Sequence, residues 1–165
     1  GASSEPSFGA LGTLDSHMAM ERRVSISTLP LDTEAQRETA VLRMLSEAGI
    51  SYTVHRHEAV QTVQEQASAV ERLGVDTSLL LKNLFLYDKK SKAYVLVTAR
   101  RTATIDLKAL AKSLGLSGSG LRFATSEAVK EMLAVTEGAV TPLSLPLRRQ
   151  ATSEVIFVLD EQAPK

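Results

Sequence analysis

The chain has 165 residues, of which 44% are hydrophobic and 23% are charged, and its formal net charge at pH 7 is zero. This length and apolar content are sufficient for one globular domain that buries its own core. The absence of cysteine excludes thiolate nucleophiles, cysteine-ligated zinc and disulfide frameworks. No apolar run approaches the roughly 18 residues of a membrane span, and we identify no signal peptide. We therefore expect a cytoplasmic protein without a membrane partner.

The zero net charge conceals an uneven distribution. Residues 1–20 carry a charge of −2 and residues 21–78 a charge of −3, whereas residues 79–165 carry thirteen basic and eight acidic side chains, a net charge of +5. Zero net charge argues against strong nonspecific binding to nucleic acid. The basic excess includes Lys89-Lys90, Arg100-Arg101 and Arg148-Arg149. Such pairs are usually solvated loop residues, and contact with phosphate groups is the alternative.

Residues 1–20 are rich in glycine, serine and alanine, and they contain Ser16-His17-Met18, a sequence typical of a cloning-derived linker. We interpret residues 1–20 as a tag or disordered leader. Residues 21–165 are then expected to form a single domain.

The apolar pattern and the capping signals predict helices and strands in mixed order. Helices are expected from a cap at Asp32 or Thr33 to Gly49, from a cap at Thr62 through Val70, from a cap at Asp106 to Gly115, and from a cap at Ser126 through Met132 or Leu133. Thr33 with Gln36 and Thr62 with Glu65 have the spacing of capping boxes. Strands are expected over residues 50–55, 79–88, 93–99, 121–123 and 155–159, with a Gly- and Pro-containing loop over 136–146. Because this order is not a regular βαβ repeat, we predict one α/β domain with a mixed sheet.

The apolar run from Leu79 to Asp88 is interrupted by Lys82 and Asn83. Continuous apolar character predicts a strand that is buried on both faces. An ammonium in such a strand must reach water, find a partner or open into a pocket, because burying it unpaired is costly. A lysine whose head reaches water at a sheet edge is the more common case, and a ligand-binding lysine is the alternative. Asn83 points to the opposite face and poses the same question.

Two further patterns are weak indicators of a site. His55 and His57 would share one face of a strand, but no third metal ligand is evident, so we expect a solvated pair and no metal site. Ser117-Gly118-Ser119-Gly120 lacks the Lys-Ser/Thr continuation of a phosphate-binding loop and is expected to be a turn.

The stretch from Gly138 to Pro142 has a composition that is common in turns. Glycine tolerates unusual dihedral angles and proline fixes φ, so such a loop can also direct backbone N–H groups toward a ligand. On its own this pattern favours a structural turn.

Four stretches together are more specific than any one of them. They are Tyr52 with His57-Glu58-Ala59-Val60-Gln61-Thr62-Val63-Gln64, then Lys82-Asn83-Leu84-Phe85-Leu86, then Ile105-Asp106-Leu107-Lys108-Ala109-Leu110-Ala111, and then Val135-Thr136-Glu137-Gly138-Ala139-Val140-Thr141-Pro142. In this order and spacing the sequence resembles the YbaK/prolyl-tRNA-editing (ProX) family of aminoacyl-tRNA deacylases, over roughly residues 35–160. The resemblance is closest to the branch that removes alanine from the proline tRNA.

The resemblance implies a mixed-sheet, barrel-like fold with helices packed outside, and hydrolysis of the ester that joins a wrong amino acid to the terminal adenosine of tRNA. The family's essential lysine corresponds to Lys82, which is expected to hold the terminal nucleotide or the reacting carbonyl. The family's Gly-x-x-x-Pro loop begins at Gly138, which is assigned a catalytic role with Lys82. The expected substrate-binding residues are Asn83, Ala139, Val140, Thr141 and Pro142. No metal or other cofactor is expected, since a positioned water and oxyanion stabilisation can supply much of the rate.

Editing is needed because a binding pocket cannot strongly exclude a smaller apolar substrate, a missing methylene being worth about 1 to 3 kcal/mol. The resemblance therefore implies a second site that admits alanine and excludes proline by size. Thr62 and Val63 are expected to line it, with a packing role as the alternative. The implied partners are the tRNA acceptor end that carries a mischarged amino acid, and prolyl-tRNA synthetase in cis or in trans.

Family members usually continue past the last strand with a His-Pro segment and an Asn-Thr-Ala-Thr-type segment, whereas this chain runs from Asp160 to Lys165. We therefore expect residues 21–165 to be an editing domain that is cut from a longer protein or lacks that segment. The leading hypothesis is an aminoacyl-tRNA deacylase. The alternative is a noncatalytic domain of the same fold that binds tRNA or docks within a synthetase assembly.

Overall fold

The structure, a computed structural model, describes residues 33–58, 60, 62–116, 120–148 and 154–163. Their strands form one mixed sheet in the order β3-β1-β2-β4. The strands are β1 (Leu81–Asp88), β2 (Ala93–Arg100), β3 (Leu121–Phe123) and β4 (Val155–Leu159). Strand β1 is antiparallel to both β2 and β3, whereas β4 is parallel to β2. The predicted α/β class and mixed sheet are confirmed, but within the described residues the sheet is open and does not close into a barrel.

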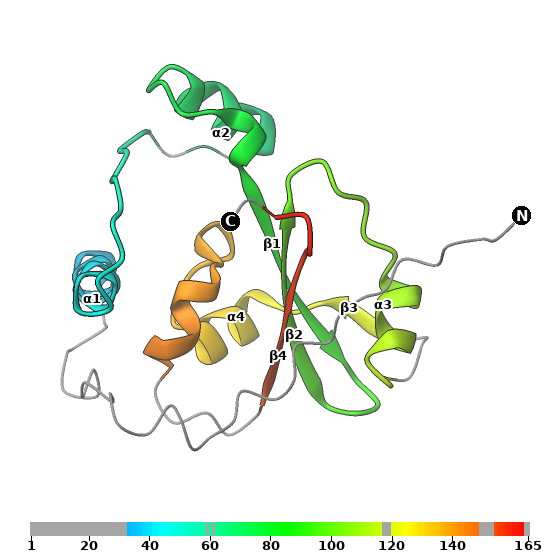
Figure 1. Cartoon of the computed structure of the whole chain (residues 1–165). Helices are drawn as coiled ribbons and strands as arrows, with labels where there is room; N and C mark the ends of the chain where they lie inside the picture. Colours follow the sequence, from blue (N-terminus) through cyan, green and yellow to red (C-terminus); the bar gives the residue numbers. More distant parts are fainter. Residues whose placement is uncertain (1–32, 59, 61, 117–119, 149–153, 164–165) are drawn as a thin grey trace, which may run out of the picture.

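Helices cover both faces of the sheet, with α3 on one side and α4 on the other (Figure 1). The helices are α1 (Glu34–Glu47), α2 (Val63–Glu71), α3 (Leu107–Ser113) and α4 (Ser126–Leu133), and the short 3-10 turns are η3 (Thr77–Leu79), η4 (Glu137–Ala139) and η5 (Pro142–Leu147). Among the described residues, none of these helices has both the length and the apolar character that crossing a membrane requires.

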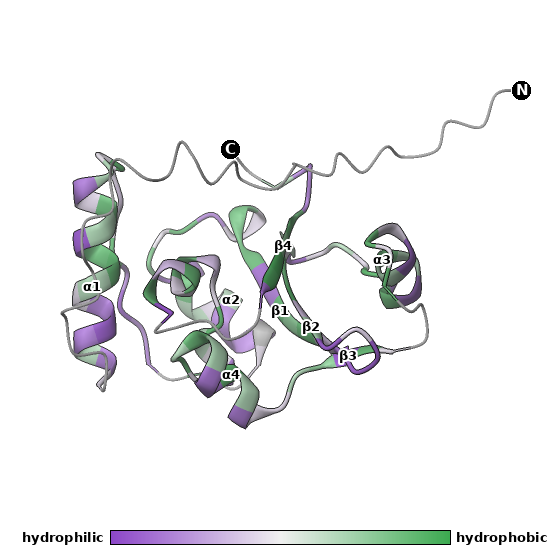
Figure 2. Cartoon of the chain, turned by 90° about the horizontal axis from the view of Figure 1, so that it is seen from below, coloured by the Kyte–Doolittle hydropathy of each residue, from purple (hydrophilic) through white to green (hydrophobic). Residues whose placement is uncertain are grey.

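Alternation along the strands produces two cores. On one face, Phe85 and Leu96 pack with Val129, Met132 and Leu133 of α4, and we call this the α4 face. On the other, Leu86, Val95 and Val97 pack with Leu110 of α3, and we call this the α3 face. Figure 2 shows the central strands as mostly hydrophobic and the helices as mixed. Because consecutive side chains point to opposite faces, each residue of β1 faces one side of the sheet or the other, and the apolar residues Leu84, Phe85 and Leu86 contribute to the two cores in alternation.

Helix ends follow their capping signals. Thr33 with Gln36 and Thr62 with Glu65 form the two predicted capping boxes, and the Asp106 carboxylate accepts hydrogen bonds from the first N–H groups of α3. These bonds satisfy N–H groups that have no partner within the helix. The sequence therefore fixes where the three helices begin.

Three predictions were wrong. Residues 50–55 form no strand: the segment lies between α1 and α2, away from the sheet, and its side chains are exposed (Figure 1). Alternation tells which residues would share a face, but a strand also needs a neighbour that supplies hydrogen bonds. The cap of α4 is Thr125 and not Ser126. The strand expected over residues 79–88 begins only at Leu81, because Thr77–Leu79 form η3. The loop expected over 136–146 contains the short turns η4 and η5. The predicted leader, residues 1–20, and Ser117-Gly118-Ser119 lie outside the described residues.

Candidate functional site

Lys82 lies near the start of β1, opposite Ala99 of β2, and therefore on the α3 face. Its side chain is partly buried, and its ammonium donates a hydrogen bond to the backbone carbonyl oxygen of Ala103. Of the alternatives for this lysine, the structure thus shows a head group held by a protein partner. An ammonium has three N–H donors, so this bond leaves donors for a ligand.

Asn83 lies on the α4 face, where its side-chain oxygen accepts a hydrogen bond from the hydroxyl of Thr98 at 2.7 Å. Thr98 is only 2% exposed, so the bond fixes the orientation of the partly buried amide. The amide nitrogen can donate two hydrogen bonds, and it has no partner among the described residues. Asn83 is therefore oriented and able to donate.

Gly138 stands in η4 and is exposed. Unlike Gly49, Gly74 and Gly115, it does not have a positive φ. A Cβ placed on Gly138 would meet no atom within 4 Å. Neither backbone conformation nor packing against the described residues therefore requires glycine here.

The other residues of this loop are held by hydrogen bonds within the loop and by packing on the core. Val140 packs on the core of the α4 face. The hydroxyl of Thr141 accepts a hydrogen bond from the N–H of Leu143, and the buried Ser144 donates its hydroxyl proton to the carbonyl oxygen of Thr141. The N–H of Ala139 donates to the carbonyl oxygen of Thr136. Pro142 begins η5, where its fixed φ suits a helical first position.

The structure does not bring Lys82 and the loop from Gly138 to Pro142 to the same face of the sheet. Lys82 is on the α3 face, and the loop packs on the α4 face together with Asn83. Lys82 and Asn83 both belong to the first part of β1. This part does not pair with β3, because β3 pairs only with Leu86–Asp88.

The other predicted residues are distributed as follows. Thr62 is exposed, and its side chain is engaged in the cap of α2. The side chain of Val63 lies outside the described residues. His55 and His57 are exposed, and Nδ1 of His57 lies 2.7 Å from the carbonyl oxygen of Glu58. No group of three or more metal-ligating side chains occurs in the part of the chain that is described.

Two charged features lie at this end of the sheet. The sequence names the basic pair Arg100-Arg101, but it does not show the partner of Arg100 or the surroundings of Arg101. The side chain and the backbone N–H of Arg100 both donate to Oδ2 of Asp160, at 2.9 and 3.2 Å. The hydrogen bond from the Arg100 side chain is the main cause that lowers the pKa of Asp160, with burial opposing it. Sixty positions separate the two residues. The pair becomes apparent only in the folded sheet, where the ends of β2 and β4 lie side by side.

The second feature is Arg101, which follows β2. Its backbone N–H donates to the carbonyl oxygen of Leu80 at 2.9 Å, which places it beside the start of β1. Its Nε is buried and has no hydrogen-bond partner among the described residues. A buried donor without a partner is costly.

Comparison with known proteins identifies the family. Residues 57–165 match the model of the aminoacyl-tRNA editing domain. The prolyl-tRNA editing protein ProX of Acetoanaerobium sticklandii is 34% identical over 77% of this chain and 73% of its own. Prolyl-tRNA synthetase associated domain-containing protein 1 of Bos taurus is 40% identical over 76% of this chain and 70% of its own.

A similar fold occurs among solved structures. The crystal structure of a hypothetical protein superposes with a TM-score of 0.56 at 21% identity, covering 73% of this chain and 72% of the other. At this identity the likeness concerns the fold alone. The family model and the two relatives together establish that the chain belongs to the aminoacyl-tRNA editing domain family.

Proposed function

We propose that this protein hydrolyses the ester bond of a mischarged aminoacyl-tRNA, with alanine on the proline tRNA as its substrate. The observation that carries the proposal is the family match over residues 57–165, a segment that contains both Lys82 and the loop from Gly138 to Pro142. The name of the ProX relative, a prolyl-tRNA editing protein, supports the tRNA identity.

In this reaction a water molecule adds to the ester carbonyl and forms a tetrahedral intermediate. The carbon–oxygen bond to the terminal ribose then breaks, so that the amino acid is released as a carboxylate, the ribose oxygen takes one proton of the water, and the other proton passes to solvent. The ammonium of Lys82 supplies positive charge either to the developing oxyanion or to the phosphate of the terminal nucleotide. Fixed donors of this kind contribute about 3 kcal/mol each when they face an oxyanion.

The unpartnered Nε of Arg101 supports an anionic ligand at the same end of β1. Arg101 lies two residues before Ala103, whose carbonyl holds Lys82. A phosphate placed there would satisfy the buried donor and share the charge of Lys82. We therefore assign the start of β1 to the terminal nucleotide.

The open space at Gly138 supports a role in binding the aminoacyl end. Since neither φ nor internal packing requires glycine there, we infer that the missing side chain leaves room for substrate. Asn83 and Val140 would line the same face, and Thr62 and Val63 would complete the wall at the start of α2. A wall that fits alanine excludes proline by its additional methylene groups.

One observation favours a second candidate function, a noncatalytic domain that binds tRNA or docks on a synthetase. Lys82 and the loop that begins at Gly138 lie on opposite faces of the sheet. A binding domain has no need of their convergence, whereas catalysis needs the substrate to contact both across the open edge of β1.

A deacylation assay separates the two candidates. We expect the wild type to release alanine from alanine-charged proline tRNA, and Lys82→Ala to abolish the release. Lys108→Ala, an exposed lysine of α3, serves as the matched control and should retain the wild-type rate. Binding of tRNA by the wild type without any release would instead favour the noncatalytic candidate.

A further inference from the structure

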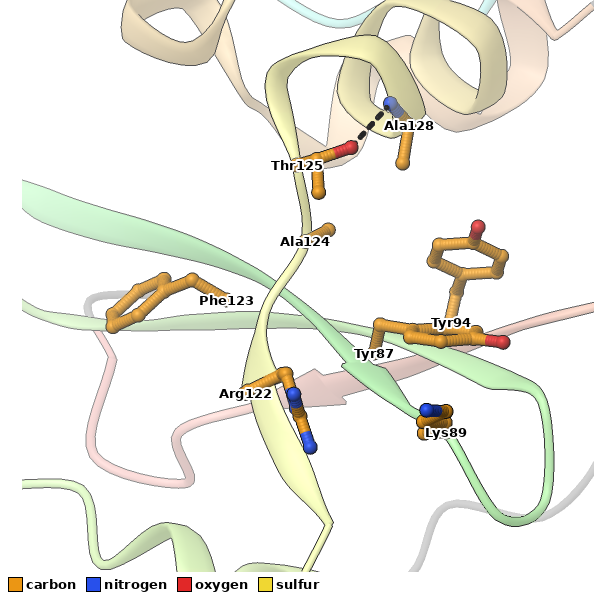
Figure 3. A pocket seen from close by; sticks show the side chains of 8 residues that line it. All are labelled: Tyr87, Lys89, Tyr94, Arg122, Phe123, Ala124, Thr125 and Ala128. Atoms are coloured by element: carbon orange, nitrogen blue, oxygen red, sulfur yellow. Dashed lines mark hydrogen bonds between the residues drawn. The ribbon is translucent and has the colours of Figure 1, made fainter.

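A cavity of about 340 Å³ lies at the other end of β1 from Lys82. It is bordered by the end of β1, the start of β2, β3 and the first turn of α4 (Figure 3). Its lining residues are Tyr87, Lys89, Tyr94, Arg122, Phe123, Ala124, Thr125 and Ala128. Two of them are cationic, three are aromatic and none is acidic, a composition that neither the mechanism above nor the core explains.

The aromatic wall of this cavity continues from the core. Tyr94 stacks on the buried Phe85 with 5.3 Å between ring centroids and 8° between ring planes. Tyr87 then lies 4.8 Å from Tyr94 at 38°. The tyrosine rings thus extend an aromatic row from the core to the cavity, whereas the ring of Phe123 points away from them in Figure 3. Exposed faces of such rings are stacking surfaces for nucleobases.

The cationic side of the cavity is held by the β1–β2 hairpin and by β3. Arg122 is paired with Tyr87 across the sheet, and so it stands on the same face. Lys89 follows β1 directly, and neither cation takes part in any ion pair found among the described residues. Both side chains are exposed. They are therefore available to an anionic partner.

The turn of the β1–β2 hairpin has a fixed conformation and carries three lysines. Asp88 is fully buried and accepts hydrogen bonds from both the N–H and the hydroxyl of Ser91. Lys92 takes the left-handed conformation, with φ of 56°. This fixed turn places Lys89, Lys90 and Lys92 at one tip, whose charge adds to that of Arg122.

Cations beside a stacking surface fit a nucleic acid better than they fit an apolar ligand. Tyr87 is five positions further along β1 than Lys82, and at 3.3 to 3.4 Å per residue that is roughly 17 Å. If Lys82 holds the terminal nucleotide, the cavity lies too far away for that same nucleotide. It lies within reach of nucleotides further along the acceptor arm.

We propose that this cavity binds the acceptor arm of tRNA, with a nucleotide against Tyr87 and its phosphates between Lys89 and Arg122. The inference rests on the proposed function for the identity of the nucleic acid. It assigns the terminal nucleotide and the acceptor arm to opposite ends of the same strand.

Binding of uncharged proline tRNA, measured over a series of salt concentrations, tests the inference without requiring catalysis. The site variant is Lys89→Gln with Arg122→Gln. The control is Lys108→Gln with Lys112→Gln, which removes the same charge from exposed positions of α3 on the opposite side of the sheet. We expect the site variant to raise Kd about tenfold and to reduce the slope of log K against log salt by about two, one for each phosphate contact. The control should change Kd less than twofold.

Stacking has its own readout, because the chain contains no tryptophan and three tyrosines, Tyr52, Tyr87 and Tyr94. Binding should quench tyrosine emission in the wild type and in Tyr52→Phe, and the quenching should be reduced in Tyr87→Leu. Thermal unfolding verifies that each variant is folded. Equal quenching in Tyr52→Phe and Tyr87→Leu would argue against a base on Tyr87.

The outcomes separate this inference from the proposed function. Loss of tRNA binding in the site variant alone supports the inference even if the wild type hydrolyses nothing. Three results would overturn it: equal effects in site and control variants, no effect in either, or a wild type that does not bind uncharged tRNA. A fourth result would also overturn the inference: a site variant that keeps tRNA binding but loses binding to purified prolyl-tRNA synthetase. The cavity would then be a protein contact.

A second assay compares two substrates. Alanine esterified to adenosine alone lacks the acceptor arm, so the site variant should hydrolyse it at the wild-type rate. With full-length alanine-charged tRNA, kcat/KM should fall about tenfold, chiefly through KM. An equal fall on both substrates would contradict a role in binding the arm.

Discussion

The ammonium of Lys82 donates a hydrogen bond to the backbone carbonyl oxygen of Ala103. This bond joins the start of β1 to the segment between β2 and α3, and it accounts for a charged side chain inside an apolar strand. It also fixes the direction of the lysine side chain on the α3 face. The same ammonium is therefore a structural contact and the proposed catalytic group.

Replacement of Lys82 should lower both stability and activity. Lys82→Met keeps the length of the side chain but removes the donor, so the free energy of unfolding should fall by about 1 kcal/mol, and deacylation should be lost. Urea denaturation measures the first effect. Lys108→Met, on the exposed side of α3, should change stability by less than about 0.5 kcal/mol. Equal stability of wild type and Lys82→Met would show that the bond to Ala103 does not persist in solution.

Gly138→Ala should reduce activity without reducing stability. No φ or steric requirement opposes a Cβ at Gly138, and alanine restricts the unfolded chain, so the free energy of unfolding should be unchanged or up to about 1 kcal/mol higher. Deacylation should fall at least tenfold if substrate fills this space. Gly115→Ala is the contrasting variant: with φ of 67° at Gly115, it should be destabilised by about 1 to 2 kcal/mol. Full activity in Gly138→Ala would remove Gly138 from the site.

Thr62 has two assigned roles that can be separated. Its hydroxyl accepts the N–H of Glu65 at 3.1 Å in the cap of α2, so Thr62→Ala should cost about 1 kcal/mol of stability. Thr62→Ser restores the cap but removes a methyl group from the proposed alanine pocket. Thermal unfolding and KM should therefore diverge in Thr62→Ser, with stability near wild type and KM raised. A wild-type KM in Thr62→Ser would leave Thr62 with its capping role alone.

The ion pair between Arg100 and Asp160 should make stability depend on pH in the acid range. The pKa of Asp160 is lower in the folded state than its usual value of 3.8, so the ionised carboxylate stabilises the fold. This contribution, about 0.5 to 1 kcal/mol for a pair of this exposure, is fully present above about pH 5 and is lost as the pH falls through the folded-state pKa.

Urea unfolding of Asp160→Asn over the same pH range provides the check. The variant should be less stable than the wild type at pH 7, and the two curves should converge as the pH falls through the lowered pKa of Asp160. Glu161→Gln, one residue further along, is the control and should follow the wild type. Curves that stay parallel at every pH would exclude Asp160 as the titrating group.

Local signals predicted much of the fold. Leu121–Phe123 and Val155–Leu159 are strands with the predicted bounds, and Thr33 and Asp106 cap their helices. These features depend on a few neighbouring residues, and the sequence displays them directly. The segment over 50–55 failed because a strand depends on a partner elsewhere in the chain, which alternation does not reveal.

The site was less accessible to sequence reasoning. Lys82 and Asn83 stood out as polar residues in an apolar run, and a family pattern assigned them, with Gly138, to a proposed site. Their division between two faces of the sheet follows only from the register of β1 and β2. The pair of Arg100 with Asp160 and the cavity beside Tyr87 depend on residues that are distant in the chain. Pairing between distant segments leaves no short motif, so these features required the structure.

The central claim is most directly tested by the rates at which the wild type deacylates one tRNA carrying two different amino acids. Proline tRNA is charged with alanine in one sample and with proline in another, and release is followed over time. We predict rapid loss of alanine and little loss of proline. The ratio of the two deacylation rates should be about 10 to 200 for each methylene that the site excludes. Equal rates for the two amino acids, or no release of alanine, would contradict the proposed editing of alanine on the proline tRNA.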